Sequence, residues 1–301
     1  MKKRILSVGE IIWDVYPEKQ VIGGAPLNFA AHAARLGAES SLLSAVGEDA
    51  LGDAALRALE NFGVGTEWVG RNARPTGQCT VSLDANGVPH YDVLRDMAYD
   101  HIRLTPQAQA DIRASRFDAL YFGTLIQRAP ESRAALRQIA ADCRPETVFC
   151  DVNLRPGCYD AESVRFCLEQ ATVLKVSMEE EPALRALGLY AVTGDTPRGI
   201  ARALAERFGQ LRTVLLTLGK DGAYGYRTEN GEDCFQPAVG ERVVSTVGAG
   251  DSFSAACLTA HLSGEPLADC MRKAALVSGF VVAHTEAVPE YPASLYDALR
   301  K

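Results

Sequence analysis

The chain of 301 residues contains no hydrophobic run that approaches the roughly 18 residues of a membrane-spanning helix. Beyond the basic residues 2–4, it has no cluster of lysine and arginine that offsets its acidic residues. Its net charge of -7 and sequence pI near 5.4 argue against a surface for nucleic acid or anionic membrane. The basic residues 2–4 lead into a short strand and not into the apolar core and cleavage site of a signal peptide, so we expect a cytoplasmic protein.

Other missing motifs narrow the function further. The eight cysteines form no C-x-x-C pair and have no histidine partners at zinc spacing, so we expect reduced, mostly buried thiols. The chain lacks the G-x-x-x-x-G-K-[ST] run of P-loop kinases, which argues against that class. We find no internal repeat, low-complexity tract or interdomain linker, so residues 1–301 predict a single domain.

Short apolar runs alternate with longer amphipathic ones along most of the chain. This alternation predicts βαβ units, and therefore an α/β fold with a mostly parallel central sheet and helices on both faces. The predicted strands are residues 4–9, 41–46, 119–122, 147–150, 172–176 and 213–218, and the predicted helices include residues 27–36, 50–62, 132–143, 164–171 and 199–208.

One region breaks this alternation. Residues 78–94 are short, β-rich and interrupted by a turn at Asp84-Ala85-Asn86-Gly87, which predicts a hairpin. Together with residues 11–16, the hairpin can form a small sheet that stands off the main one. Such a sheet is a candidate lid over the carboxyl ends of the parallel strands, where open α/β sheets bind ligands.

The stretch from Ser245 to Phe253 carries the strongest functional signal. It places Gly248, Ala249 and Gly250 at the predicted start of a helix, where backbone N–H groups lack intrahelical partners and favour an anion. Asp251 beside this anion hole can take a proton from an alcohol while the hole stabilises a transferring phosphoryl group. Alternatively, Asp251 only caps the helix, and the motif alone favours the two interpretations equally.

Further polar residues follow the predicted strands. Gly23-Gly24-Ala25-Pro26-Leu27-Asn28 opens a helix, where paired glycines let the backbone approach a ligand and Asn28 offers a donor and an acceptor to a hydroxyl. A simple loop-to-helix turn with proline near the first position is the alternative. Asp14 is another hydroxyl acceptor, or a solvated surface residue. Asp151-Val152-Asn153-Leu154-Arg155 places acid, amide and guanidinium on alternating positions that can converge on one ligand.

A second set of candidates lies nearer the carboxyl terminus. Lys175 ends a strand, and residues 179–181 are glutamates that begin a helix, where acids complement the helix dipole or hold Mg²⁺ through water. Residues 217–222 form a strand followed by a tight turn, which is either an ordinary β-turn or a phosphate or ribose contact.

The two glycine-rich motifs resemble the amino- and carboxy-terminal signatures of the PfkB family, the ribokinase-like carbohydrate kinases. The resemblance extends from near the first residue to the last, and the order and separation of the motifs make the pair specific. The Gly-Gly-Ala-Pro-x-Asn form, together with Asp151-x-Asn153-x-Arg155, is most similar to the fructokinase branch. The resemblance implies a three-layer ribokinase-like sandwich with a β lid, built from segments near 11–20 and 71–103, that closes on sugar and commonly dimerises.

The resemblance also implies the cofactors ATP and Mg²⁺, and a role for each candidate residue. It implies that Asp251 is the catalytic base and that the anion hole is formed by Gly248, Ala249 and Gly250. The implied sugar ligands are Asp14, Gly24 and Asn28, and two basic residues face phosphate, Arg155 on the sugar side and Lys175 on the ATP side. The implied ATP site is lined by Thr217, Gly219 and Gly222, and Glu180 is implied to lie near Mg²⁺.

Two positions depart from the family pattern. Ser177-Met178-Glu179-Glu180 stands where the family often has Asn-x-x-Glu, so the Mg²⁺ assignment depends on Glu180 alone. Ser245 stands where the family tends to carry the Asp of a monovalent-cation site, which argues against activation by K⁺.

Two other classes of function are alternatives to a sugar kinase. A dinucleotide-dependent oxidoreductase fails on detail, because the third glycine of G-x-G-x-x-G would fall on Phe253 and the acid about 20 residues on, Asp269, lies in helical sequence. A sugar-binding regulator without catalysis is disfavoured by the intact Asp251 motif. The sequence therefore predicts an ATP-dependent sugar kinase acting on fructose, with 2-keto-3-deoxygluconate or a nucleoside as alternative substrates.

Overall fold

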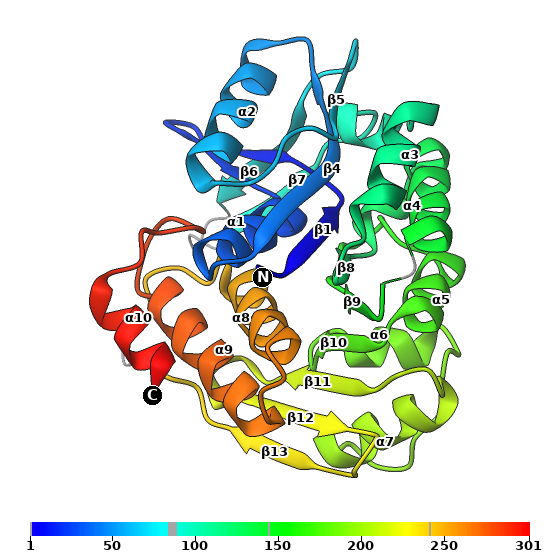
Figure 1. Ribbon diagram of the computed structural model, residues 1–301, viewed down its shortest axis with the longest axis vertical. Helices are drawn as coiled ribbons and strands as arrows, with labels where there is room; N and C mark the ends of the chain where they lie inside the picture. Colours follow the sequence, from blue (N-terminus) through cyan, green and yellow to red (C-terminus); the bar gives the residue numbers. More distant parts are fainter. Residues whose placement is uncertain (1, 84–88, 144, 241) are drawn as a thin grey trace.

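A nine-stranded sheet forms the centre of the computed structural model, which describes residues 2–83, 89–143, 145–240 and 242–301 (Figure 1). Seven strands, β5, β4, β1, β8, β9, β10 and β11 in spatial order, run parallel to one another, and β12 and β13 extend the sheet as antiparallel strands. In spatial order the strands are β13 (Asp233–Gln236), β12 (Ala223–Arg227), β11 (Thr213–Thr217), β10 (Val173–Ser177), β9 (Thr147–Asp151), β8 (Ala119–Phe122), β1 (Arg4–Val8), β4 (Glu39–Gly47) and β5 (Val69–Asn72). The predicted mostly parallel sheet is confirmed.

Helices cover both faces of this sheet because alternate strand residues point to opposite sides. Leu6, Leu120 and Leu174 pack in one core with α3 (Pro106–Ser115), α4 (Pro130–Cys143), α5 (Ala161–Gln170), α6 (Glu181–Ala186) and α7 (Pro197–Arg207). Ile5 and Phe149 pack in a second core with α1 (Ala25–Arg35), α8 (Ala249–Leu262), α9 (Leu267–Val281) and α10 (Ala293–Arg300), and α2 (Ala50–Phe62) packs beside α1 in a third. The arrangement is the expected three-layer sandwich. No helix of the described part of the chain is long and apolar enough to cross a membrane.

A separate four-stranded sheet stands beyond the carboxyl ends of the central strands (Figure 1). Its order is β3 (Gln20–Gly23), β2 (Ile12–Val15), β6 (Gly77–Leu83) and β7 (Pro89–Val93). The antiparallel β6 and β7 are the predicted hairpin, although the predicted turn at residues 84–87 lies outside the described residues. The strands of the small sheet lie within 12–23, 77–83 and 89–93. Residues 71–72, which the sequence placed in the lid, belong to β5 of the main sheet.

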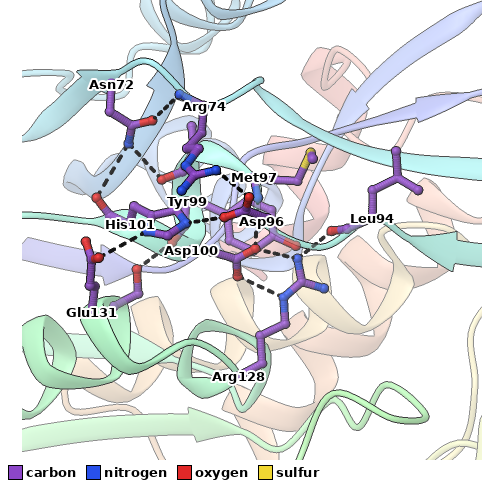
Figure 2. A network of polar contacts seen from close by, with 12 residues as sticks. Asn72, Arg74, Leu94, Asp96, Met97, Tyr99, Asp100, His101, Arg128 and Glu131 are labelled. Carbon is purple, nitrogen blue, oxygen red and sulfur yellow. Dashed lines mark hydrogen bonds and ion pairs between the residues drawn. The ribbon is translucent and has the colours of Figure 1, made fainter.

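A network of polar contacts joins the exit from the small sheet to the body of the protein (Figure 2). Arg128 donates to both carboxylate oxygens of Asp100 at 2.8 Å, and each side chain is only 3% exposed. The same guanidinium donates to the carbonyl oxygens of Val93 and Leu94, at the end of β7. Because Arg128 lies two residues before the start of α4, this ion pair fixes where the chain leaves the small sheet.

Removing one partner of a buried ion pair leaves the other charge without compensation. We therefore expect Arg128→Met to lower the free energy of unfolding by about 3–5 kcal/mol in urea denaturation. The matched control is Arg74→Met, because Arg74 pairs with Asp96 in the same network but both side chains are at least half exposed. Its loss should cost less than about 1 kcal/mol. Equal losses in the two variants would contradict a structural role for the buried pair.

Candidate active site

Asp251 lies in the first turn of α8, at the carboxyl ends of the central strands. The helix begins after Gly248, whose φ of 80° favours glycine and where an added Cβ would lie 2.6 Å from the carbonyl oxygen of Ala287. No side chain caps this helix start. Asp251 is therefore not the helix cap that one interpretation of the sequence proposed.

The carboxylate of Asp251 instead contacts the other glycine-rich motif. Its Oδ2 atom accepts a hydrogen bond of 2.8 Å from Nδ2 of Asn28, which lies in the first turn of α1 and is buried. Gly24, just before α1, has a φ of 109°, and an added Cβ there would lie 2.6 Å from the carbonyl oxygen of Glu10. The two motifs, separated by more than 200 residues, thus meet at two helix N-termini.

The electrostatics of Asp251 are set by several neighbours. Burial raises its pKa to about 6, and the negative charge of Asp151 acts in the same direction. The hydrogen bond from Asn28 and the charges of Lys175 and Arg155 lower the pKa. A carboxyl with a pKa of about 6 is mostly ionised at neutral pH, as the sequence led us to expect, and can accept a proton there.

The helix start above the sheet offers backbone N–H groups to an anion. The amide of Ala249 donates to the carbonyl oxygen of Thr246 at 3.2 Å, so this hydrogen bond competes with any anion for the group. A Cβ added at Gly250 would lie 3.1 Å from Nζ of Lys175, which places the ammonium group directly against the first turn of α8. The positive charge of Lys175 therefore adds to the positive end of the helix dipole.

Lys175 is held in a buried ion pair. Its Nζ donates to Oδ2 of Asp151 at 2.7 Å, and the hydroxyl of Ser254 on α8 donates to the same oxygen at 3.1 Å. Burial acts to lower the pKa of Lys175, but the charges of Asp151 and Glu180 outweigh it, so the pKa is raised. The sequence placed Lys175 at the phosphate of ATP. In the structure, Lys175 packs against the first turn of α8, and only 6% of the residue is exposed.

Asp14 and Asn28 face the same side of the small sheet. A Cβ added at Gly23 would lie 3.8 Å from Oδ2 of Asp14 and 4.0 Å from Nδ2 of Asn28, so the carboxylate and the amide are near each other. Burial raises the pKa of Asp14 to about 6, and Arg155 lowers it. Arg155 is exposed and also lowers the pKa values of Asp251 and Glu10, so its charge acts on all of these carboxyls.

Glu10 is a site residue that the sequence analysis missed. It follows β1, is 4% exposed, and has a pKa raised to about 7, chiefly by burial. The signal available in the sequence was its position: an acid directly after a buried parallel strand, at the edge of the sheet where ligands bind.

The predicted metal residue, Glu180, follows β10, and the predicted ATP residues lie at the end of β11 and in the turn after it. Thr217 ends β11, and Gly219 has a φ of 57° with open space around it. Gly222, with a φ of 121°, is required by the turn into β12, because an added Cβ would lie 2.2 Å from the carbonyl oxygen of Gln236. This steric need alone accounts for glycine at position 222.

Glu180 connects the loop after β9 to the end of β10. Its Oε1 accepts from the N–H of Leu154 at 2.6 Å, and its Oε2 accepts from the N–H of Ser177 at 2.8 Å. Both oxygens are thus engaged by backbone amides, which leaves room for a metal only through water or the remaining lone pairs. Within the described ranges, no group of three or more His, Cys, Asp and Glu residues could hold a metal ion by itself.

Comparisons with known proteins give a family and several similar chains. The pfkB family carbohydrate kinase model matches residues 4–293. The chain is 26% identical to an ATP-dependent 6-phosphofructokinase of Thermoanaerobacterium thermosaccharolyticum, covering 98% of this chain and 94% of that protein. It is 30% identical to a fructokinase of Klebsiella pneumoniae, covering 95% and 92%. The solved structure of a fructokinase with bound ATP from Xylella fastidiosa shares the fold, with a TM-score of 0.83, 21% identity and coverage of 99% and 98%.

The Asn28–Asp251 hydrogen bond makes a prediction that requires no assumption about activity. Asn28→Ala removes a donor that favours the charged carboxylate, so the pKa of Asp251 should rise above about 6. Carboxyl-selective ¹³C NMR titration measures this, with Asp251→Asn used to assign the resonance. Asn230→Ala, at an exposed position, is the control. An unchanged midpoint in Asn28→Ala would show that the hydrogen bond does not set the charge of Asp251.

Proposed function

Because the chain belongs to the pfkB family of carbohydrate kinases, we propose that it transfers the γ-phosphoryl group of MgATP to a hydroxyl of free fructose. The observation that carries this proposal is the Asn28–Asp251 hydrogen bond of 2.8 Å. It joins a hydroxyl-binding amide to a basic carboxylate at a helix N-terminus, which is the arrangement that phosphorylation of an alcohol requires.

The proposed mechanism relies mainly on positioning and charge. Phosphoryl transfer has a loose transition state, so the protein must align the reactants and stabilise oxygens that remain anionic. Asp251 accepts the proton of the sugar hydroxyl, and Asn28 holds its carboxylate in place. The Gly248 and Gly250 amides, the α8 dipole and Lys175 together stabilise the transferring group. MgATP would supply the phosphoryl group. Glu180 orders the backbone on that side and would hold Mg²⁺ through water.

The residues that we propose bind the sugar favour a neutral polyol as the phosphoryl acceptor. Asp14 and Asn28 offer acceptors and a donor to hydroxyl groups, and the sequence form of the first motif is most similar to fructokinases. Arg155 is the group that would favour 2-keto-3-deoxygluconate, because a guanidinium can bind its carboxylate. A nucleoside is a further alternative. A sugar-binding regulator without catalysis is disfavoured because Asp251, Asn28 and the glycine turn are all in place.

Two further properties belong to this proposal. The hydroxyl of Ser245 accepts from the N–H of Val247 at 3.2 Å and brings no negative charge to balance a cation, so we propose that K⁺ is not required. We also propose that the protein forms a homodimer through the small sheet. The edge strands β3 and β7 offer backbone groups for pairing with a second copy.

A coupled assay of ADP release across a panel of sugars tests the substrate. We expect the highest kcat/KM with fructose, ahead of ribose, adenosine and 2-keto-3-deoxygluconate, with MgATP as donor. A much higher kcat/KM with 2-keto-3-deoxygluconate would assign Arg155 to a substrate carboxylate and replace fructose. If every sugar tested releases no ADP, the kinase proposal itself is wrong.

A matched pair of substitutions separates the base from a binding residue. Asp251→Asn keeps the size of the side chain but removes the base, so kcat should fall by roughly 10²–10⁴-fold. Asp14→Asn keeps a hydroxyl-binding group and should mainly raise the KM for the sugar. In the parent enzyme, kcat/KM should decline below about pH 6, because Asp251 must be ionised to accept the proton. Near-parental kcat in Asp251→Asn would remove Asp251 from the mechanism.

A further inference from the structure

One face of α1 carries three polar side chains that reach other parts of the chain. Asn28, His32 and Arg35 are spaced by four and three residues, so they lie on the same side of the helix. Asn28 donates to Asp251 on α8. His32 and Arg35 contact the segment 282–292 between α9 and α10, which runs beside α1 (Figure 1). The helix that orients the proposed base therefore also holds this segment.

His32 is fully buried and makes a hydrogen bond at each ring nitrogen. Its Nε2 lies 2.9 Å from the carbonyl oxygen of Ala287, and its Nδ1 lies 2.6 Å from the hydroxyl of Tyr291. A carbonyl oxygen can only accept, so Nε2 carries the proton and donates. Burial lowers the pKa of His32 to about 4, so the ring is neutral at neutral pH and Nδ1 accepts from Tyr291. The two hydrogen bonds thus have different and fixed directions.

Ala287 also packs against the glycine turn that precedes Asp251. A Cβ added at Gly248 would lie 2.6 Å from the carbonyl oxygen of Ala287 and 3.0 Å from its Cα atom. Val247 packs in the same hydrophobic core as Ala287 and Val288. The carbonyl group of Ala287 is therefore adjacent both to the imidazole of His32 and to the turn from which α8 begins.

The other polar attachment of this segment is exposed. Arg35 donates to the two carboxylate oxygens of Glu290 at 2.6 and 2.7 Å, but the Glu290 side chain is 89% exposed. Exposed ion pairs contribute little, whereas a buried carbonyl group that loses its donor carries a desolvation penalty. The buried hydrogen bond from His32 to Ala287 is therefore the stronger attachment.

We propose that His32 is a positioning residue, which holds the carbonyl group of Ala287 and thereby fixes the Gly248 turn. This inference rests on the function proposed above, in which the amides of that turn bind the transferring phosphoryl group. One helix then places the base through Asn28 and the anion hole through His32. The distance between the two parts of the site is set by a single rigid element.

Two substitutions separate the two ring nitrogens of His32. Nδ1 is bonded to Cγ, as Oδ1 of asparagine is, so His32→Asn keeps an acceptor for Tyr291 but loses the donor to Ala287. Nε2 lies one atom further out, as Nε2 of glutamine does, so His32→Gln keeps the donor to Ala287. Tyr291→Phe removes only the hydrogen bond to Nδ1. A role through Ala287 predicts that His32→Asn differs from the other two variants.

Hydrogen exchange read by mass spectrometry tests this contact without an assay of activity. Residues 246–252 should exchange about tenfold faster in His32→Asn, because the group that packs against the turn is no longer held. In His32→Gln and Tyr291→Phe their exchange should stay within about twofold of the parent. Residues 213–217 of β11 should exchange as in the parent in all three variants, which separates a local loosening from a general loss of stability.

The exchange data can contradict the proposal in two ways. A change confined to residues 282–292 would show that His32 holds only its own segment. Equal changes at 246–252 in His32→Asn and His32→Gln would show that the hydrogen bond to Ala287 is not the cause. If His32→Asn does not fold, Val288→Ala loosens the same buried segment with His32 in place. Exchange at 246–252 should then rise about threefold, and parental exchange there would overturn the proposal.

The kinetic test uses the kinase activity. In His32→Asn, kcat should fall about tenfold to a hundredfold, because small displacements of the amides weaken transition-state stabilisation. The KM for fructose should change less than about threefold, and His32→Gln should restore kcat to within about threefold of the parent. A parent that releases no ADP would refute the proposed function, while the exchange data would still decide whether His32 holds the turn. An active His32→Asn enzyme with parental kcat would overturn the positioning role.

Discussion

The hydrogen bond between Asn28 and Asp251 is the interaction on which the site depends. It connects the first turns of α1 and α8, and each of these helices begins at a glycine with positive φ that packs against neighbouring backbone. Each helix start packs against its neighbouring backbone, Glu10 for α1 and Ala287 for α8, only because Gly24 and Gly248 carry no side chain. The position of the Asp251 carboxylate therefore depends on the backbone conformation at these two glycines.

This geometry has an electrostatic cost that the protein only partly offsets. Burial raises the pKa values of Asp14 and Asp251 to about 6 and that of Glu10 to about 7. A carboxyl with a raised pKa destabilises the folded state progressively as the pH rises toward that value, so these groups favour the fold in acid more than at neutral pH. Lys175 and Arg155 reduce the penalty. The acids are thus better explained by chemistry at the site than by stability.

The sequence was a good guide to whatever is decided locally. The alternation of apolar runs predicted the sheet, because burial on both faces leaves that pattern in each strand. The glycine turn before Asp251 was visible for the same reason, since a positive φ and an anion-binding helix start need only neighbouring residues. Glu180 shows the limit of this approach. Its first-turn position suggested a dipole or metal role, but its partners include the amide of Leu154, 26 residues away.

Contacts between distant segments could not be read from the sequence because either partner alone has many possible neighbours. The Lys175–Asp151 pair forms when β9 and β10 align Asp151 with Lys175 in register, and the Arg128–Asp100 pair forms only when the segment after β7 reaches the residues just before α4. These two buried pairs have complementary effects. The Lys175–Asp151 pair sets the charge beneath the first turn of α8. The Arg128–Asp100 pair fixes the segment after β7, through which the chain passes from the small sheet to the rest of the protein. The helix start of α8 and the exit from the small sheet are therefore held by separate buried ion pairs, so each can be altered by substitution without directly removing the other.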